Sequence, residues 1–462
     1  MNAAPRDLTL YWWGQTASAF GSVFTAVALP VVAVVQLGAS PAQVAQVSAA
    51  ATLPVLLLGL PVGVLVDRIA RPRRALLTLD TVSAAAVGVV ALGLAGHLVT
   101  IGWLVLLALV QGAVTVVTEV VYFVHLRQLT ESTDGGGTSP LARARARLQA
   151  GEFGAGLVGR LLAGPTIVVL GAAAALAVDG LSYLLSLAAL LTMRRAAAAP
   201  RTPAAGRAAR PRDAFAGLRL LVGDDFRRAL TVFLVAPVFA AAGVTALTAP
   251  FLLRVLHVPA AVYGVTGAAA GLLGMVGSIV ASRVLAPHRD ARRIMAGAFT
   301  CAIGAALLLP LAGGPLPVAL CCAALGIGVP IFFGSIANVA LGPVLVCDVA
   351  EEATGRVIAT LQVVAAAATT LGAITGGALG EWLGVRSAMW GLDLGALAAV
   401  LLALPTLLRS GRPGSTPAGR RGTGDAADAT DVTAVMEAAA ELDGHLGEPA
   451  HLGVEGHGPA VQ

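Results

Sequence analysis

The chain has 462 residues, of which 57% are hydrophobic and only 12% are charged, and its formal net charge is +5. Soluble domains carry roughly a quarter charged residues, so this composition excludes a soluble globular protein and indicates many membrane spans. The sequence contains no lysine. A Walker A loop needs a lysine on the phosphates, so ATP is excluded as an energy source within this chain.

Apolar runs long enough to cross a bilayer, about 20 residues each, recur along the chain and are separated by short breaks with Arg, Gly and Pro. The first run lacks a small-residue cleavage site, so it is predicted to remain as a span. The sequence therefore predicts an all-α membrane protein with twelve transmembrane helices, near residues 11–36, 44–66, 75–95, 99–124, 149–171, 173–193, 228–253, 261–285, 293–312, 316–341, 355–379 and 386–408.

Arginine falls almost entirely on one side of these spans, and the other side receives only Arg254 and Arg386. Because basic loops stay in the cytoplasm, both termini are predicted to be cytoplasmic. An Ala, Pro and Arg-rich linker and a polar, Gly-rich tail flank the second set of spans. The predicted units are a six-helix half over 1–193, a cytoplasmic linker over 194–227, a second six-helix half over 228–408 and a disordered cytoplasmic tail over 409–462.

The two predicted halves echo each other. The stretch "ALPVVAVVQLGASPAQV" from Ala28 resembles "TAPFLLRVLHVPAAVYG" from Thr248. Each has a Pro inside a span and, about ten residues later, a Pro that starts the next helix. Repeated halves are common in secondary transporters, which handle substrate between the halves near the bilayer midplane.

The segment "GVLVDRIARPRR" follows the second predicted span. A basic loop alone would anchor the topology, but here an acid precedes the arginines and follows a Gly by four residues. The segment resembles the loop signature of the major facilitator superfamily. In that family the Gly lets two helices approach, and the charged residues form a charge-relay lock that holds the outward-facing state. The resemblance implies a gating loop made of Gly63, Asp67, Arg68, Arg71, Arg73 and Arg74, with the acid near the start of a second-half helix around Gly355.

Other stretches narrow the resemblance. "LYWWGQTASAFGSVFTAVALP", "ARARLQAGEFG", "VDGLSYLLSLAALL" and "GRVIATLQ" resemble the bacterial branch of the superfamily that holds macrolide-efflux and enterobactin-exporter proteins. This resemblance covers residues 6–408 and implies export of drugs, siderophores or other hydrophobic small molecules. At Gly21 and Ser22 the chain departs from relatives that often carry an acid after the Gly.

The fifth predicted span contains "GEFGAGLVGRLLAGP", with an acid at Glu152 and a permanent charge at Arg160. Gly151, Gly164 and Pro165 match in part a pattern of superfamily antiporters on this span. Small residues permit close packing and Pro removes a backbone bond, so these three residues are predicted to form a gate on helix five. Glu152 is predicted to lie in the first turn of the span, where water and the helix N-terminus favour an acid.

Arg160 is predicted near mid-membrane, where a charge costs at least about 3 kcal/mol unless it is paired or faces water. Glu119, in the fourth span, is its predicted partner, and the pair would couple proton binding to substrate. The alternative is a static ion pair that only supports packing. Asp393 in the last span is the second proton candidate. Asp80 and Asp179 are expected to be structural, Asp80 through pairing with the arginines of the gating loop.

A cavity for hydrophobic cargo needs apolar and aromatic walls with a few polar groups. The predicted lining residues are Gln15, Phe20, Phe24, Tyr122, Phe239, Phe332, Asn338 and Gln362.

The predicted function is secondary active efflux of hydrophobic or amphipathic small molecules by proton antiport and alternating access. The chain is predicted to work without a cofactor or metal, as a monomer in the bacterial plasma membrane. The net charge indicates a basic face beside anionic lipid headgroups and not a nucleic-acid partner. Because a carboxylate can serve H⁺ or Na⁺, the coupling ion stays open. Two alternatives also stay open: an uptake symporter of the same fold, and a non-transporting scaffold or sensor that acts through the tail. No nucleophile–base constellation suggests an enzyme.

Overall fold

The computed structural model describes residues 3–67, 72–134, 138–193, 225–284, 290–348 and 351–409. Most of the predicted linker and nearly all of the predicted tail lie outside these ranges, as do Arg68 and Arg71 of the predicted gating loop. The helices are α1 (Ala3–Val31), α2 (Pro41–Asp67), α3 (Pro72–Ala95), α4 (Ile101–Asp134), α5 (Thr138–Leu170), α6 (Ala172–Thr192), α8 (Asp225–Pro250), α9 (Ala260–Val284), α10 (Ala291–Ala306), α11 (Leu308–Leu311), α12 (Leu316–Asp348), α13 (Glu351–Leu383) and α14 (Val385–Arg409), with π-helical turns η1 (Val32–Gln36) and η2 (Phe251–Val255).

Twelve spans of this helical set, counted over the described ranges, are long and apolar enough to cross a membrane. This confirms the predicted all-α membrane fold. One span is interrupted, because α10 and α11 are separate helices that meet at Leu307. Pro310 lacks the N–H that would continue the α-helical ladder there. Many large apolar side chains face outward, among them Leu92, Val169 and Leu402 at 76%, 77% and 80% exposed, as expected for a surface that contacts lipid.

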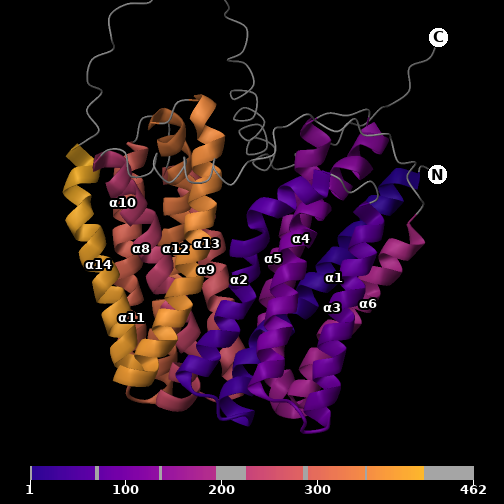
Figure 1. Ribbon diagram of the computed structural model, residues 1–462, viewed down its shortest axis with the longest axis horizontal. Coiled ribbons are helices and arrows are strands. Elements are labelled where there is room, and N and C mark those ends of the chain that lie inside the picture. The colour runs from indigo at the N-terminus through magenta and orange to yellow at the C-terminus, as the bar shows by residue number, and fades with distance from the viewer. Residues whose placement is uncertain are drawn as a thin grey trace, which may run out of the picture. The chain divides into compact units, whose positions relative to one another are not determined.

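Figure 1 shows α1 to α6 gathered on one side and α8 to α14 on the other, with α2, α5, α9 and α13 between them. Contacts across the two sets run mainly between α5 and α9 and between α2 and α13. A small buried cluster of alanines joins α2, α8 and α13. Small side chains at these crossings are expected, because helices in lipid associate through close packing and not through a hydrophobic drive.

The echo between the halves is present in the backbone. Pro30 precedes the π-helical turn η1 and Pro250 precedes η2. Each turn closes through an N–H of the following residue, at 3.0 Å in η1 and 2.9 Å in η2. The two turns therefore end the first helix of each half in the same way.

Left-handed backbone conformations also recur at equivalent connections of the two halves. Gly38 follows the first π-helical turn with φ 63° and His257 follows the second with φ 52°. The three matched pairs of left-handed residues are Gly38 with His257, His97 with Gly314, and Gly171 with Gly384. Histidine occupies, in one half, a conformation that glycine adopts without cost in the other.

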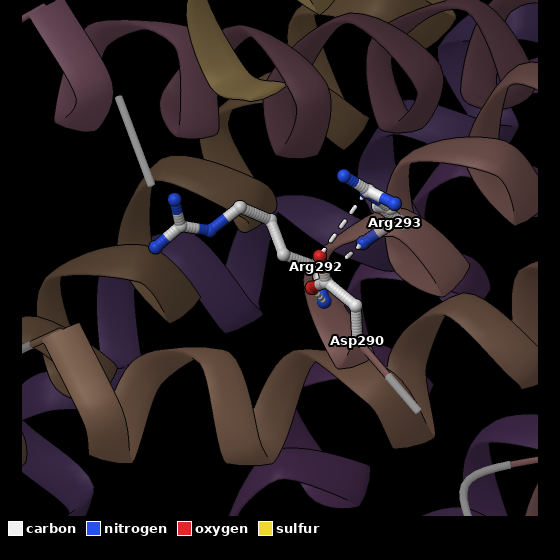
Figure 2. Close-up of polar contacts among 3 residues, drawn as sticks. All are labelled: Asp290, Arg292 and Arg293. Atoms are coloured by element: carbon white, nitrogen blue, oxygen red, sulfur yellow. Dashed lines mark hydrogen bonds and ion pairs between the residues drawn. The ribbon is translucent and has the colours of Figure 1, made fainter. Parts of the chain in front are cut away.

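The start of α10 shows how a basic loop is tied to its helix. Figure 2 shows Asp290 beside the first residues of the helix, where its carboxylate accepts from the backbone N–H groups of Arg292 and Arg293 at 3.1 and 3.4 Å. The same carboxylate pairs with Nε of Arg293 at 3.3 Å. This is an N-cap, which satisfies backbone donors that the first helical turn leaves open.

The left-handed pair yields a prediction about stability. His257→Gly should raise the unfolding temperature, because it relieves a left-handed strain of about 1 kcal/mol. Gly38→Ala should lower it by a similar free energy, since an added Cβ there meets nothing within 4 Å and only the backbone is strained. Thermal unfolding in detergent would measure both. Equal effects of the same sign would contradict this account.

Candidate functional site

A polar cavity of about 460 Å³ lies among α1, α4 and α5, and we call it the first-half cavity. Its wall contains Glu119, Glu152 and Arg145, together with Gln15 and Tyr122 from the predicted lining set. Asp80 of α3 also lines it, so the cavity brings three carboxylates and a guanidinium to one space.

Glu152 differs from its prediction. Helix α5 begins at Thr138, so Glu152 lies well inside the helix and not in its first turn. It is half-buried, and its carboxylate accepts from the hydroxyl of Tyr122 at 3.3 Å. The prediction failed because the helix continues beyond the apolar segment that marked the span. Glu152 therefore belongs to the cavity wall and not to a solvated helix start.

Asp80 also has a different partner from the one predicted. It is buried, and its carboxylate accepts from the hydroxyl of Ser186 on α6 at 2.7 Å. Arg73 instead donates to the carbonyls of Leu190 and Leu191 at 2.7 and 3.0 Å. These carbonyls belong to the last turn of α6, which has no intrahelical donors for them. Arg73 thus satisfies the end of α6 in this conformation.

The other described residues of the predicted gating loop lie at the end of α2 and the start of α3. Gly63 and Asp67 lie in the last turns of α2, and Asp67 ends the helix. Arg74 is exposed near the start of α3. Helix α13, which the acid was predicted to meet, begins at Glu351 and not at Gly355. The charge-relay lock stays a prediction.

A chain of hydrogen bonds runs beside the first-half cavity. The hydroxyl of Tyr183 lies 3.1 Å from Ser22 Oγ and accepts from the amide of Gln111 at 3.2 Å. Ser83 donates to the same amide group at 2.9 Å. The chain links α1, α6, α4 and α3. The sequence analysis did not single out these residues. Gln111 and Tyr183 could have been found, because polar side chains inside apolar spans are candidates for a functional site.

Asp179 has contacts that fit the structural role expected for it. It is fully buried and accepts from Thr25 on α1 and, at 2.7 Å through its backbone carbonyl, from Ser182. Gly21 faces this point, because an added Cβ there would lie 2.0 Å from Ser182 Oγ. Close approach of α1 and α6 thus explains the small residue at Gly21.

The predicted ion pair between Glu119 and Arg160 is not formed in this conformation. Glu119 is exposed in the wall of the first-half cavity. The side chain of Arg160 lies instead along α9, where Cβ atoms added at Gly267 and Gly271 would meet its Cδ at 3.3 Å and its Nη1 at 3.1 Å. Glycines leave room there for the long side chain. Within the described ranges its guanidinium forms no hydrogen bond or ion pair, so this charge is unpaired in the described conformation.

The predicted gate on helix five packs on two different helices. A Cβ at Gly151 would lie 2.6 Å from Thr16 Oγ1 of α1, whereas one at Gly164 would lie 2.3 Å from the Ala261 carbonyl oxygen of α9. Pro165 is exposed inside α5. Gly164 therefore sets the spacing between the halves, and Gly151 sets a spacing within the first half.

A second cavity, of about 540 Å³, lies within α8, α10, α12, α13 and α14, and we call it the second-half cavity. Its wall is mostly aliphatic and includes the predicted residues Asn338, Gln362 and Asp393. Asp393 is 2% exposed and its Oδ2 has no hydrogen-bond partner. A third cavity, of about 430 Å³, lies between the halves and includes Thr245 and Tyr263 with residues of α1, α2 and α4.

The four phenylalanines of the predicted lining set lie elsewhere. Phe24 is buried in the first-half core and stacks on Phe20 with ring centroids 5.1 Å apart. The rings of Phe332 and Phe333 meet edge to face, with centroids 5.2 Å apart. The carbonyl of Phe239 packs against Gly372, where an added Cβ would lie 2.2 Å away. None of the four lines the three cavities described above. Helical periodicity could not tell a core face from a cavity face.

The halves touch at one end of α2 and α13. The N–H of Ala42, at the start of α2, donates to Glu381 near the end of α13 at 3.4 Å. A Cβ at Gly380 would lie 3.3 Å from that of Pro41. Nearby, Arg254 in η2 donates through Nη2 to the carbonyl of Val34 in η1 at 2.9 Å.

Farther along the same two helices, the hydroxyls of Thr52 and Thr370 lie 3.3 Å apart. All these contacts cross from one half to the other, and those at the helix ends lie where α1 joins α2.

The sequence matches the profile of the Major Facilitator Superfamily over residues 11–344. The chain therefore belongs to this superfamily of membrane transporters, which agrees with its twelve spans. A search of curated protein sequences finds no match.

Solved structures of other members are similar in fold. The nucleoside transporter NupG has a TM-score of 0.65 at 14% identity over 88% of this chain and 99% of that chain. A bacterial homolog of the human lysosomal transporter Spinster, inward-facing and unoccupied, has a TM-score of 0.64 at 16% identity, over 90% of this chain and 100% of that chain. A bacterial homologue of the iron transporter ferroportin, in the inward-facing state, has a TM-score of 0.64 at 16% identity, over 89% of this chain and 100% of that chain. These identities define the fold and leave the cargo open.

The crossing of α5 and α9 yields a second prediction. Gly264→Ala should destabilise the protein by about 1–3 kcal/mol, because the new Cβ would lie 2.1 Å from the Arg160 carbonyl oxygen. Gly267→Ala is the matched control, since its Cβ meets only the flexible Arg160 side chain. Thermal unfolding in detergent would compare them. Equal stability of the two variants would contradict the proposed backbone contact.

Proposed function

We propose that this transporter exports hydrophobic or amphipathic small molecules by proton antiport with alternating access. The observation that carries the proposal is the separation of two cavities, one lined by carboxylates in the first half and one mostly apolar in the second half. An acid that can gain and lose a proton is the minimum for proton coupling, and apolar walls suit hydrophobic cargo. The resemblance to macrolide-efflux and enterobactin-exporter proteins supports export over uptake.

The orientation proposed for the chain has both termini in the cytoplasm of a bacterial cell, on the strength of the arginine distribution. The contacts between Ala42 and Glu381 and between Val34 and Arg254 would then close the extracellular side. The conformation would be inward-facing, as are the Spinster and ferroportin homologues that it resembles. The linker over 194–227 and the tail over 409–462 would both lie in the cytoplasm.

Two acids would mark the two ends of the cycle. Helices α2 and α13 run antiparallel across the interface, and in this conformation the start of α2 lies beside the end of α13. Glu381 near the end of α13 meets the start of α2, and Asp67 ends α2, as the predicted lock at the start of α13 requires. A carboxylate is favoured at a helix N-terminus. Exchange of these two contacts would therefore accompany the exchange of open sides.

Glu119 is the proposed proton carrier of the first half, with Glu152 and Arg145 in the same wall. Arg160 stands unpaired against α9 in the described conformation. Because an unpaired charge near mid-membrane is costly, we propose that it pairs with Glu119 when the halves rearrange. Asp393 would supply the charge in the second half.

An uptake symporter would share the fold and the gating loop, and the similar structures include nucleoside, peptide and iron transporters. Expression in cells that lack their own pumps would separate the directions. We expect lower accumulation of several neutral and charged hydrophobic dyes than in cells without the protein. Higher accumulation would favour uptake. A scaffold acting through its tail would leave dye levels unchanged, and it would fail if truncation after Arg409 left dye export intact.

Glu119→Gln should abolish dye transport driven by a pH gradient in proteoliposomes, because the amide cannot carry the coupled proton. Counterflow without a gradient should persist, which shows that the variant is folded. Asp225→Asn, at an exposed acid at the start of α8, is the control and should keep its coupled rate. Coupled transport by Glu119→Gln at the rate of the unmodified protein would exclude Glu119 as the carrier.

Pro41→Cys with Gly380→Cys should form a disulfide, because a Cβ at Gly380 lies 3.3 Å from that of Pro41, close to the lower end of the range of about 3.5–4.5 Å seen in disulfides. The four native cysteines would first be replaced by Ala. Oxidation should stop transport and reduction should restore it, since the link holds one side closed. Each single cysteine variant is a control. Full transport by the cross-linked protein would argue against alternating access at this end.

A further inference from the structure

The second-half cavity contains a charge that the fold does not use. Asp393 is 2% exposed, and its Oδ2 lacks a hydrogen-bond partner. Among the described residues that line the cavity, Asp393 is the sole charged side chain, and Thr245, Thr248, Asn338 and Gln362 are the polar ones. A buried carboxylate without a partner is strongly unfavourable. A bound proton or a cationic ligand must balance it.

The first half shows that such an acid can be satisfied by the protein. Gly171 stands just before α6 and Gly384 stands just before α14. Asp179 follows Gly171 by eight residues, and Asp393 follows Gly384 by nine. Asp179 accepts from Thr25 and from the hydroxyl of Ser182. Three residues after Asp393 the chain has Ala396, where Ser182 follows Asp179, so the second half lacks that hydroxyl. Asp393 lies in the wall of the cavity instead.

We propose that the second-half cavity is a binding site for an amphipathic monocation, an apolar body with one positive charge, and that Asp393 is its counterion. The aliphatic walls would bury the body and the carboxylate would pair with the charge. The volume of about 540 Å³ falls in the range of small-molecule sites, roughly 300–1,000 Å³. The site names the cargo class of the proposed exporter, so its role as a transport site rests on the proposed function.

Other ligand classes fit this cavity less well. An anion would face the Asp393 carboxylate, and no basic residue of the described wall offers it a partner. A metal ion needs several oxygen, nitrogen or sulfur ligands, and the described residues hold no group of three His, Cys, Asp or Glu side chains placed for one. A wholly apolar ligand would fill the walls and leave the carboxylate unbalanced.

Tetraphenylphosphonium and tetraphenylborate have the same shape and opposite charges, so they separate charge from size. We expect the purified protein in detergent to bind tetraphenylphosphonium at least tenfold more tightly than tetraphenylborate at equilibrium. Asp393→Asn should weaken binding of the cation at least tenfold, whereas Asp393→Glu should keep part of the affinity. Asp179→Asn is the matched control, since that carboxylate has its own donors, and its affinity for the cation should change less than twofold.

Folding is checked in the same experiment. Asp393→Asn removes a buried charge without a partner, so it should unfold at the same temperature as the unmodified protein or higher. The cation should raise the unfolding temperature of the unmodified protein and of Asp179→Asn but not that of Asp393→Asn. Equal affinity for the two ions, or unchanged cation binding in Asp393→Asn, would overturn the proposal.

The binding measurement uses no gradient and no second compartment, so it is independent of export. Cation binding that depends on Asp393, together with an absence of proton-driven transport, would leave the site standing and overturn the proposed function. Proton-driven export of neutral dyes without cation binding at Asp393 would do the reverse.

Discussion

Backbone contact between helices at glycine is the constraint on which the arrangement of the two halves depends. In lipid, helices gain little from burying apolar surface against each other, so association relies on close packing. At Gly164 and Gly264, α5 and α9 come close enough that a single Cβ would collide with the opposing backbone. Gly377 plays the same part on α13, where an added Cβ would lie 2.2 Å from that of Ala45. These contacts place Arg160 of the first half against the glycines of α9 in the second half.

The polar groups inside the halves follow from a second constraint. Water is absent from the hydrocarbon core, so each polar group needs a partner within the protein. Ser22, Tyr183 and Gln111 satisfy one another, and Asp80 and Asp179 are served by hydroxyls. Against this background the unsatisfied groups stand out. Among the described residues, Asp393 has an oxygen without a hydrogen-bond partner and Arg160 forms no hydrogen bond or ion pair at the interface. In the proposed function these are the groups that a transport cycle or a ligand would engage.

The repeated halves share backbone devices but differ in chemistry. Both use a π-helical turn after the first helix and left-handed residues at the matching connections. Their cavities differ, because carboxylates and an arginine line the first and aliphatic side chains line the second. A duplicated scaffold thus carries two unlike sites. This division gives coupling and cargo binding separate places in the proposed mechanism.

The spans, the echo of the halves and the superfamily were all accessible from the sequence, because they rest on local patterns: bilayer-length apolar runs, prolines and a loop signature. The partners of the charged residues were not. Glu152 accepts a hydrogen bond from Tyr122, Asp80 accepts one from Ser186, and the side chain of Arg160 packs against the glycines of α9. In each case the surroundings differ from those predicted. A helix presents every residue on some face, and which face meets which neighbour depends on the packing of all the helices together. Span number is therefore a property of the sequence, and the identity of each contact was decided only by the tertiary structure.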